Sequence, residues 1–221
     1  MTTNQTYQSF IIKINESATT DSLSCDKGRF VNLYNNVQNR IIESFLDRRF
    51  EDDIRYLQTI LVDDLKISSS QDHLDHQDFK LPENYFDFSN AYALATKDTC
   101  KNAKIDLFEI KDENRNNILT DEYSKPSFKF REAPFNIASD KIKVYTGQDF
   151  QINDIILSYY RYPVQIGLID SENPESDFNN KNPEFDDKLM NRIIGLCASE
   201  FYLNSDDGKA QIEKANAAQK I

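Results

Sequence analysis

Glycine and histidine are scarce in this chain, and their scarcity argues against several common enzyme classes. Five glycines are spread over 221 residues. They form no Gly-x-Gly-x-x-Gly loop, no Walker loop and no Gly-x-Ser-x-Gly elbow, so the sites built on those loops are not indicated. The two histidines, His73 and His76, lie in a polar connector, a poor place for the rigid base of a Cys–His or Ser–His pair.

Cysteine and long apolar runs are also lacking. Cys25, Cys100 and Cys197 are odd in number and have no Cys-x-x-Cys spacing, which argues against a disulfide framework and a zinc knuckle. We therefore expect three free thiols. No apolar run approaches the roughly 20 residues that cross a bilayer, and Met1–Glu16 lacks the layout of a secretory signal. We expect no membrane partner and a protein made inside a cell.

Basic charge is outnumbered by acidic charge. The formal net charge is −11, which argues against general nucleic-acid binding, because neutralising phosphates requires a basic surface. An acidic wall would still suit a channel through which DNA slides without being gripped. Carboxylates are plentiful, so counting alone does not exclude a hydrolase built on two of them. The absence of tryptophan, and of a cluster that combines aromatic rings with carboxylates, argues against this alternative.

The clearest strand runs from Asp154 to Pro163. Ile155, Leu157 and Tyr159 project from one side while Ile156, Tyr160 and Tyr162 project from the other, because side chains alternate along a strand. Both faces are apolar, which predicts a central strand covered on both sides. Pro163 ends it. We expect helical segments at both ends of the chain to cover the sheet.

Helical spacing dominates residues 26–66 and returns late in the chain. Apolar residues recur every three or four positions from Phe30 to Leu65. Asn182-Pro183-Glu184 is typical of a helix start and opens a C-terminal helical segment, 183–221. Residues 1–25 are polar apart from a short patch at Phe10–Ile14, which predicts a flexible arm or an arm that docks on a neighbouring subunit as an added strand.

A β-rich core is predicted for residues 79–170. Tyr85–Ala95 and Lys104–Lys111 form a hairpin in this interpretation, and Phe128–Ile137 and Lys141–Thr146 add further strands. The fold class is therefore α+β, with N-terminal helices, a central mostly antiparallel β-sheet and C-terminal helices. We expect residues 26–204 to form one structural unit.

The connector 67–77 contains the one candidate metal pair. His73 and His76 lie three residues apart among aspartates, and on a helical turn the two imidazoles could share a zinc ion. The context is typical of a loop and the spacing is common, so we predict a solvated connector and no metal or other cofactor. The calcium-like spacing that begins at Asp112 lacks the glycine and glutamate of a calcium loop, and a solvated turn is predicted there.

Several short motifs occur in a recognisable order. They are Asn39-Arg40-Ile41-Ile42, Arg49-Phe50-Glu51-Asp52-Asp53-Ile54-Arg55-Tyr56, Leu81-Pro82, Lys125-Pro126-Ser127, Ile142-Lys143-Val144-Tyr145, Leu157-Ser158-Tyr159-Tyr160-Arg161-Tyr162-Pro163 and Asn182-Pro183-Glu184-Phe185. With this order, the chain resembles the head-to-tail connector, or adaptor, proteins of tailed bacteriophages, in particular the ring proteins below the portal in crAss-like phages. The resemblance covers most of residues 26–204.

The resemblance implies a structural virion protein without enzymatic activity or cofactor. Such a protein is made in the host cytoplasm and forms a ring in the neck of the particle, a dodecamer by analogy. Its implied partners are copies of itself, the portal protein, other neck or tail rings, and genomic DNA that passes without tight binding. Alternatives are an assembly factor absent from the finished particle and the carboxylate hydrolase. Candidate interface residues are Arg48, Arg49, Arg55, Tyr160, Arg161 and Tyr162, together with the terminal arms.

Overall fold

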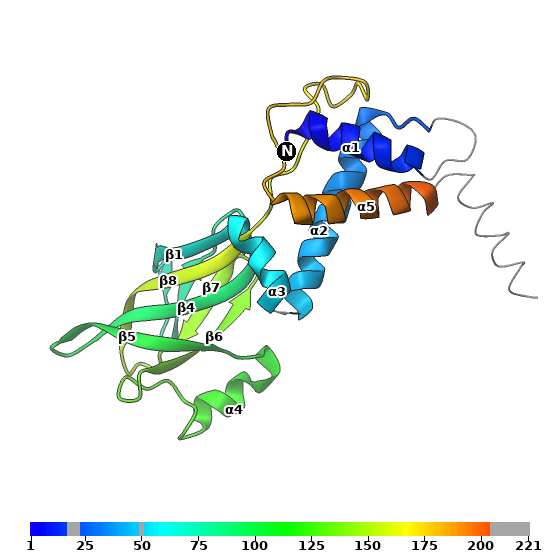
Figure 1. The fold of residues 1–221 in the computed structure, drawn as a ribbon. Coiled ribbons are helices and arrows are strands. Elements are labelled where there is room, and N and C mark those ends of the chain that lie inside the picture. The colour runs from blue at the N-terminus through cyan, green and yellow to red at the C-terminus, as the bar shows by residue number, and fades with distance from the viewer. Residues whose placement is uncertain (17–22, 49–50, 204–221) are drawn as a thin grey trace, which may run out of the picture. The chain divides into compact units, whose positions relative to one another are not determined.

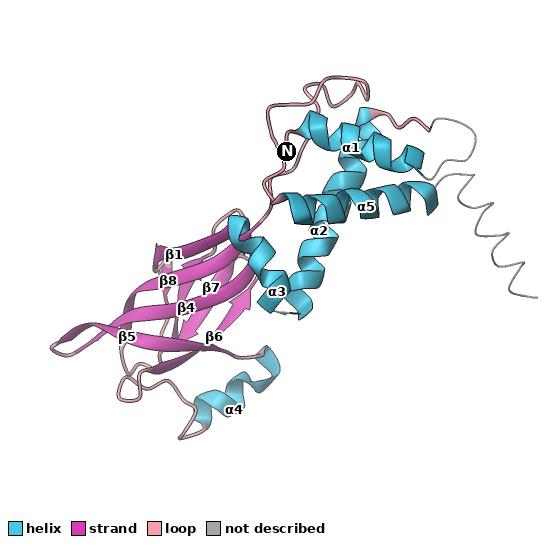
Figure 2. Ribbon diagram, viewed as in Figure 1, coloured by secondary structure: helices cyan, strands magenta, loops and turns pink. Residues whose placement is uncertain are grey.

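The chain divides into a helical unit and a strand unit in a computed structural model that describes residues 1–16, 23–48 and 51–203. Met1–Thr59 and Pro163–Ile221 make up the helical unit, and Ile60–Tyr162 make up the strand unit. The strand unit is inserted into the helical one, so residues 26–204, predicted to form one structural unit, contribute to both. The α+β fold class is confirmed: helices occur toward both ends of the sequence, and the residues between them in chain order form a curled, mostly antiparallel sheet (Figures 1 and 2).

Helix α1 (Thr3–Glu16) corrects the prediction of a flexible or strand-forming arm. Phe10 and Ile14 are fully buried. The Phe10 ring lies 5.1 Å from the ring of Phe30 and 5.8 Å from that of Phe201, centroid to centroid. These contacts tie the first helix to helices α2 (Lys27–Arg48) and α5 (Asp187–Leu203). The apolar patch therefore orders the N-terminal segment within its own chain.

Helix α5 begins later than its sequence predicts. The Asp186 carboxylate accepts a hydrogen bond of 2.8 Å from the backbone N–H of Leu189, so Asp186 caps the helix in place of Asn182. Asn182 instead accepts a hydrogen bond of 3.0 Å from the backbone N–H of Thr3 at the start of α1. The prediction that a helix starts at Asn182 is therefore wrong, and the Asn182 side chain instead accepts from the first turn of α1.

The helical stretch predicted for residues 26–66 is shorter in the structure. After α2 come a short helix, α3 (Glu51–Ile54), and a 3₁₀ helix, η1 (Arg55–Ile60). Strand β1 (Leu61–Ser68) then follows, so the last part of the predicted helical segment is extended. The predicted connector also contributes strand β2 (Gln71–Asp72) and the beginning of β3 (His76–Lys80).

Eight strands form one sheet in the order β1-β8-β4-β5-β6-β7-β3-β2. The remaining strands are β4 (Tyr85–Lys97), β5 (Cys100–Glu109), β6 (Glu132–Ala138), β7 (Lys141–Tyr145) and β8 (Gln151–Arg161). The predicted hairpin is confirmed as β4 and β5, which pair antiparallel (Figure 1). Only β5 and β6 pair in parallel among the strands described. The core begins earlier than predicted, at Leu61, and its last strand ends at Arg161.

The segment between β5 and β6 is partly helical. The predicted turn contains a 3₁₀ helix, η2 (Asp112–Asn114), and a short helix, α4 (Arg115–Thr120). The strand predicted from Phe128 begins only at Glu132. Arg131 just before it has a φ of 61°, a left-handed conformation that interrupts an extended chain.

Strand β8 is central, as predicted, with β1 on one side and β4 on the other. Its face carrying Ile155, Leu157 and Tyr159 is buried. Ile156 and Ser158 on the opposite face are only half-buried, so the prediction of two fully covered faces is wrong. The buried cluster that includes the inner face of β8 consists of residues of the strand unit alone. The sheet curls, so its own strands cover this face, which the sequence interpretation expected helices to cover.

The side chain of Gln77 closes the curl between two strands that are not neighbours in the sheet. Pairing of β1 with β8 extends only to Asp154, and Ile152 lies two residues closer to the start of β8. Gln77, which is buried on β3, accepts a hydrogen bond of 2.6 Å from the Ile152 N–H through Oε1 and donates one of 3.0 Å to the Ile152 carbonyl through Nε2. One amide side chain thus continues the hydrogen bonding where β1 has ended.

Candidate functional site

The arginines proposed as interface residues lie in the helical unit. Arg48 is the last residue of α2 and Arg55 is the first of η1, and both are exposed. Arg49 lies outside the described residues. Nearby, the Asp53 carboxylate lies 3.9 Å from the guanidinium of Arg192 on α5. Arg48 and Arg55 therefore remain accessible candidates for an interface.

The tyrosine–arginine end of β8 is less accessible than expected. Tyr160 is only 6% exposed, which makes it unavailable as a surface anchor in the folded chain. Arg161 is half-buried, and its Nη1 donates a hydrogen bond of 3.1 Å to the carbonyl of Tyr162. Tyr162 is 50% exposed, and its ring packs edge-on at 4.7 Å from that of Phe86. Of the three residues, only Tyr162 presents an apolar surface.

Two more exposed aromatic rings lie between β5 and β6, where the sequence interpretation proposed no interface. Tyr123 is 89% exposed and Phe130 is 66% exposed. Lys129 places its ammonium 5.5 Å from the Phe130 ring, and Arg131 places its guanidinium 4.6 Å from the ring of Phe128. Exposed aromatic rings next to cationic groups are typical of interaction surfaces. Their isolated positions in a polar segment gave no periodic signal in the sequence.

The cysteines do not offer a reactive thiol in the core. All three are free, as predicted. Burial raises the pKa of Cys25 to about 11 and that of Cys197 to about 12, so both remain protonated near neutral pH. Cys100 is exposed at the start of β5. Neither buried cysteine is suited to act as a nucleophile.

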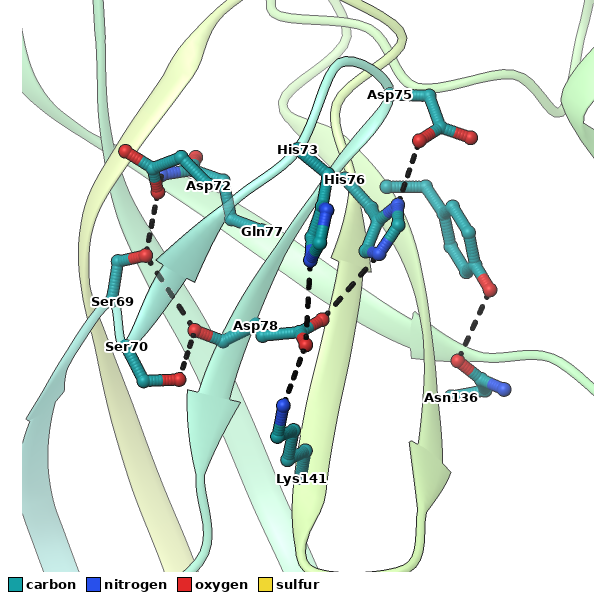
Figure 3. Close-up of polar contacts among 11 residues, drawn as sticks. Ser69, Ser70, Asp72, His73, Asp75, His76, Gln77, Asp78, Asn136 and Lys141 are labelled. Atoms are coloured by element: carbon teal, nitrogen blue, oxygen red, sulfur yellow. Dashed lines mark hydrogen bonds and ion pairs between the residues drawn. The ribbon is translucent and has the colours of Figure 1, made fainter.

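The most concentrated group of ionisable side chains lies at the turn from β2 into β3. His73 and His76 stack with ring centroids 4.4 Å apart and an interplanar angle of 19°. Both direct Nε2 toward Asp78, at 3.7 Å from Oδ2 for His73 and 3.5 Å from Oδ1 for His76 (Figure 3). Asp78 is 3% exposed and also faces Lys141, whose Nζ lies 3.1 Å from Oδ2.

Backbone hydrogen bonds hold this turn in place. The N–H of His73 donates to the carbonyl of His76 at 2.9 Å. The carbonyl of Asp75 accepts from the N–H groups of Thr146 and Gly147 at 3.0 and 3.3 Å, which attaches the turn to the segment after β7. Gly147 has a φ of 55°, a conformation that glycine adopts without strain. The two histidines therefore project from a fixed hairpin and not from the solvated connector that was predicted.

A shallow pocket of about 240 Å³ adjoins the hairpin. Asp72, His73 and Gln77 contribute to its wall, and Phe150 forms part of its apolar lining. The Asp72 carboxylate accepts hydrogen bonds from Ser69 at 2.6 Å and from Gln77 at 2.8 Å, and these hydrogen bonds lower its pKa. The pocket is thus polar on the hairpin side.

The sequence matches no known family model. A search of curated proteins likewise found no match. Among the described residues, no helix combines the length and the apolar character needed to span a bilayer.

Proposed function

We propose that this protein is a structural subunit of the neck of a tailed bacteriophage, forming a ring that connects the portal to the tail and extends the DNA channel. The observation that carries the proposal is the ordered set of short motifs from Asn39 to Phe185. The most distinctive of them, Leu157–Pro163, spans the last part of β8 and the boundary between the strand unit and the helical unit.

The charge of the chain fits a channel wall. A net charge of −11 disfavours tight contact with phosphates, so DNA can pass a ring of such subunits without being held. The ring is a virion component in this proposal, synthesised in the host cytoplasm. Portal and tail proteins are its partners, and no cofactor takes part.

Ring closure requires two different surfaces on each subunit, because head-to-tail contacts are heterologous. The exposed rings of Tyr123 and Phe130 offer one apolar surface on the strand unit, and Tyr162 offers another. Arg48 and Arg55 are exposed polar candidates on the helical unit. Tyr160 is not among the contacts we propose for the folded subunit, because it is buried.

Light scattering on the purified full-length chain, alone and mixed with the portal protein of the same genome, tests this function. A stoichiometric ring complex with the portal is expected. A Tyr123→Ser/Phe130→Ser double variant should weaken ring formation at least tenfold. Ile169→Ser, a matched change at a residue that is 73% exposed on the helical unit, should not.

Mass spectrometry of purified virions provides the second readout. Presence of the chain in stoichiometric amounts is expected. A chain that is absent from virions and ignores the portal would overturn the proposal and favour an assembly factor. Turnover on a glycan panel by such a chain would favour the carboxylate hydrolase instead.

A further inference from the structure

The carboxylate of Asp78 is buried with one oxygen left without a hydrogen-bond donor. Asp78 is 3% exposed, and its Oδ1 is buried and makes no hydrogen bond. The nearest cationic candidate for this oxygen is His76 Nε2, at 3.5 Å, too far for a strong hydrogen bond. Leaving a charged oxygen buried and unpaired is costly. The geometry of Asp78 therefore points to a cation that belongs at Oδ1.

Lys141 does not fill this role. Its Nζ lies 3.1 Å from Oδ2, the other oxygen of the same carboxylate. The backbone carbonyl of Asp78 is also occupied, accepting from the N–H of Ser70 at 2.8 Å. These contacts fix the carboxylate on its strand, where Oδ1 faces the imidazole of His76 and Oδ2 faces that of His73 (Figure 3).

Asp75 selects the nitrogen that His76 can offer to a metal. The Nδ1 of His76 lies 2.7 Å from Asp75 Oδ1, within hydrogen-bonding distance. A proton on Nδ1 leaves the lone pair on Nε2, which points toward Asp78. A carboxylate behind a ligating histidine is the usual way in which proteins orient such a ligand.

We propose that His73 Nε2, His76 Nε2 and Asp78 Oδ1 bind a zinc ion. The ligand atoms of these three residues all lie within 4.8 Å of one another. Tetrahedral zinc with bonds of about 2.0–2.1 Å places its ligands about 3.3 Å apart, so closing on the metal requires movements of about 1 Å. Two imidazoles with one carboxylate favour zinc over magnesium or calcium, which prefer oxygen ligands alone.

The fourth position of this site is open to water. The His73 side chain is 35% exposed and that of His76 is 20% exposed, so the metal would lie near the surface of the hairpin. The ion would join the β2–β3 turn to the buried strand residue Asp78. The site stands apart from the proposed ring function, because none of its ligands belongs to the candidate interface.

Calorimetric titration of zinc chloride into the metal-free full-length chain tests the site. Because His73 and His76 are the only histidines in the sequence, NMR of imidazole signals reports on them alone. A Cys100→Ser background removes the exposed thiol as a competing ligand. We expect one zinc per chain and shifts of both imidazole signals.

Three variants then identify the ligands. His73→Ala alters an exposed turn residue and should weaken zinc binding at least tenfold without unfolding the chain. Asp75→Asn removes the positioning carboxylate and should cost about 10- to 100-fold. Asp72→Asn, the matched control at a neighbouring carboxylate outside the ligand set, should leave affinity within twofold.

Two results would overturn the zinc site. One is the lack of saturable binding by the metal-free chain, which would leave the cluster as a network of ion pairs. The other is wild-type affinity in His73→Ala with unshifted imidazole signals, which would place any bound zinc elsewhere.

Discussion

Replacing Gln77 with alanine should open the curled sheet where β3 meets β8. The buried Gln77 amide forms both hydrogen bonds to the backbone of Ile152, a residue whose side chain is itself 2% exposed. Alanine can form neither bond. The substitution therefore leaves an N–H and a carbonyl of β8 without partners beyond the end of β1.

The cost follows from the two backbone groups. A buried donor or acceptor left without its partner destabilises a protein by about 1–3 kcal/mol, so the two groups together should cost about 2–6 kcal/mol. That range corresponds to roughly 30- to 25,000-fold faster amide exchange at Ile152, if the same opening exposes this amide. Loss of the hydrogen bond from Gln77 to Asp72 adds little, because Asp72 is exposed and water can replace the donor.

Hydrogen exchange resolved to single amides is the suitable assay, because the two compact units can unfold in separate steps. Gln151→Ala, the same chemical change at the exposed neighbouring residue, serves as the control and should change exchange by less than threefold. A Gln77→Glu variant adds a pH test. Its carboxylate accepts from the Ile152 N–H but cannot donate until protonated, so protection should improve as pH falls toward 4.

The reasoning fails if the Ile152 amide of Gln77→Ala stays protected to within a factor of three of wild type. It also fails if Gln151→Ala is as disruptive as Gln77→Ala. Either result would mean that the apolar contacts of the strands close the sheet without the amide.

Three further predictions concern other parts of the chain. Phe10→Ala should destabilise the helical unit by about 3–5 kcal/mol, since Phe10 is fully buried, and loss of helical circular dichroism at lower urea would show it. Gly147→Ala should cost about 1 kcal/mol, because a residue with a side chain is strained at a φ of 55°. A β-branched valine should be strained more than alanine, so equal losses for the two variants in thermal unfolding would contradict this reasoning. Hydrogen bonds from Lys66 and Ser68 lower the pKa of Asp154, so its carboxylate should stabilise the fold above its unfolded pKa of about 3.9 and lose that effect as pH falls through the lower folded value. This pH-dependent contribution to stability should be under about 1 kcal/mol. Asp154→Asn should remove it, which a comparison of urea midpoints at pH 7 and pH 3 would show.

Much of the strand unit could be read from the sequence because its strands alternate clearly. Ile155, Leu157 and Tyr159 marked β8, and the β4–β5 hairpin followed from two apolar runs around a polar turn. Strand β1 was missed because the spacing of Leu61 and Leu65 satisfies a helix as well as a strand. Only the pairing of β1 with β8, a contact between segments far apart in the sequence, favours the strand over the helix.

Helix α1 was missed for a different reason. Its buried face combines Phe10 and Ile14 with Thr3 and Thr6, and threonine does not register as part of an apolar stripe. Thr6 is buried because its hydroxyl donates to the carbonyl of Thr2 at 2.9 Å, and Thr3 because its hydroxyl donates to the carbonyl of Lys181. The partner of Thr6 is local, but that of Thr3 is Lys181, far away in the sequence.

The histidine–aspartate cluster was only half visible in the sequence. His73 and His76 were identified as a possible metal pair, but only under the assumption that they lie on a helical turn. On a strand, His76 and Asp78 lie two residues apart and share a face. That signal could have brought Asp78 into the set. The approach of Lys141 from β7 could not be predicted, because it depends on the register of β3 with β7.

The insertion of the strand unit into the helical unit determines the order in which a ribosome can complete them. All residues of the strand unit have been made once Tyr162 has been added, whereas α1 and α2 must wait for α5. Until then the face of α1 that carries Phe10 lacks the Phe201 ring, and the Thr3 N–H lacks its acceptor Asn182. The first helix of the chain is therefore among the last to complete its packing, and during synthesis its partly covered apolar face is a surface on which aggregation can begin.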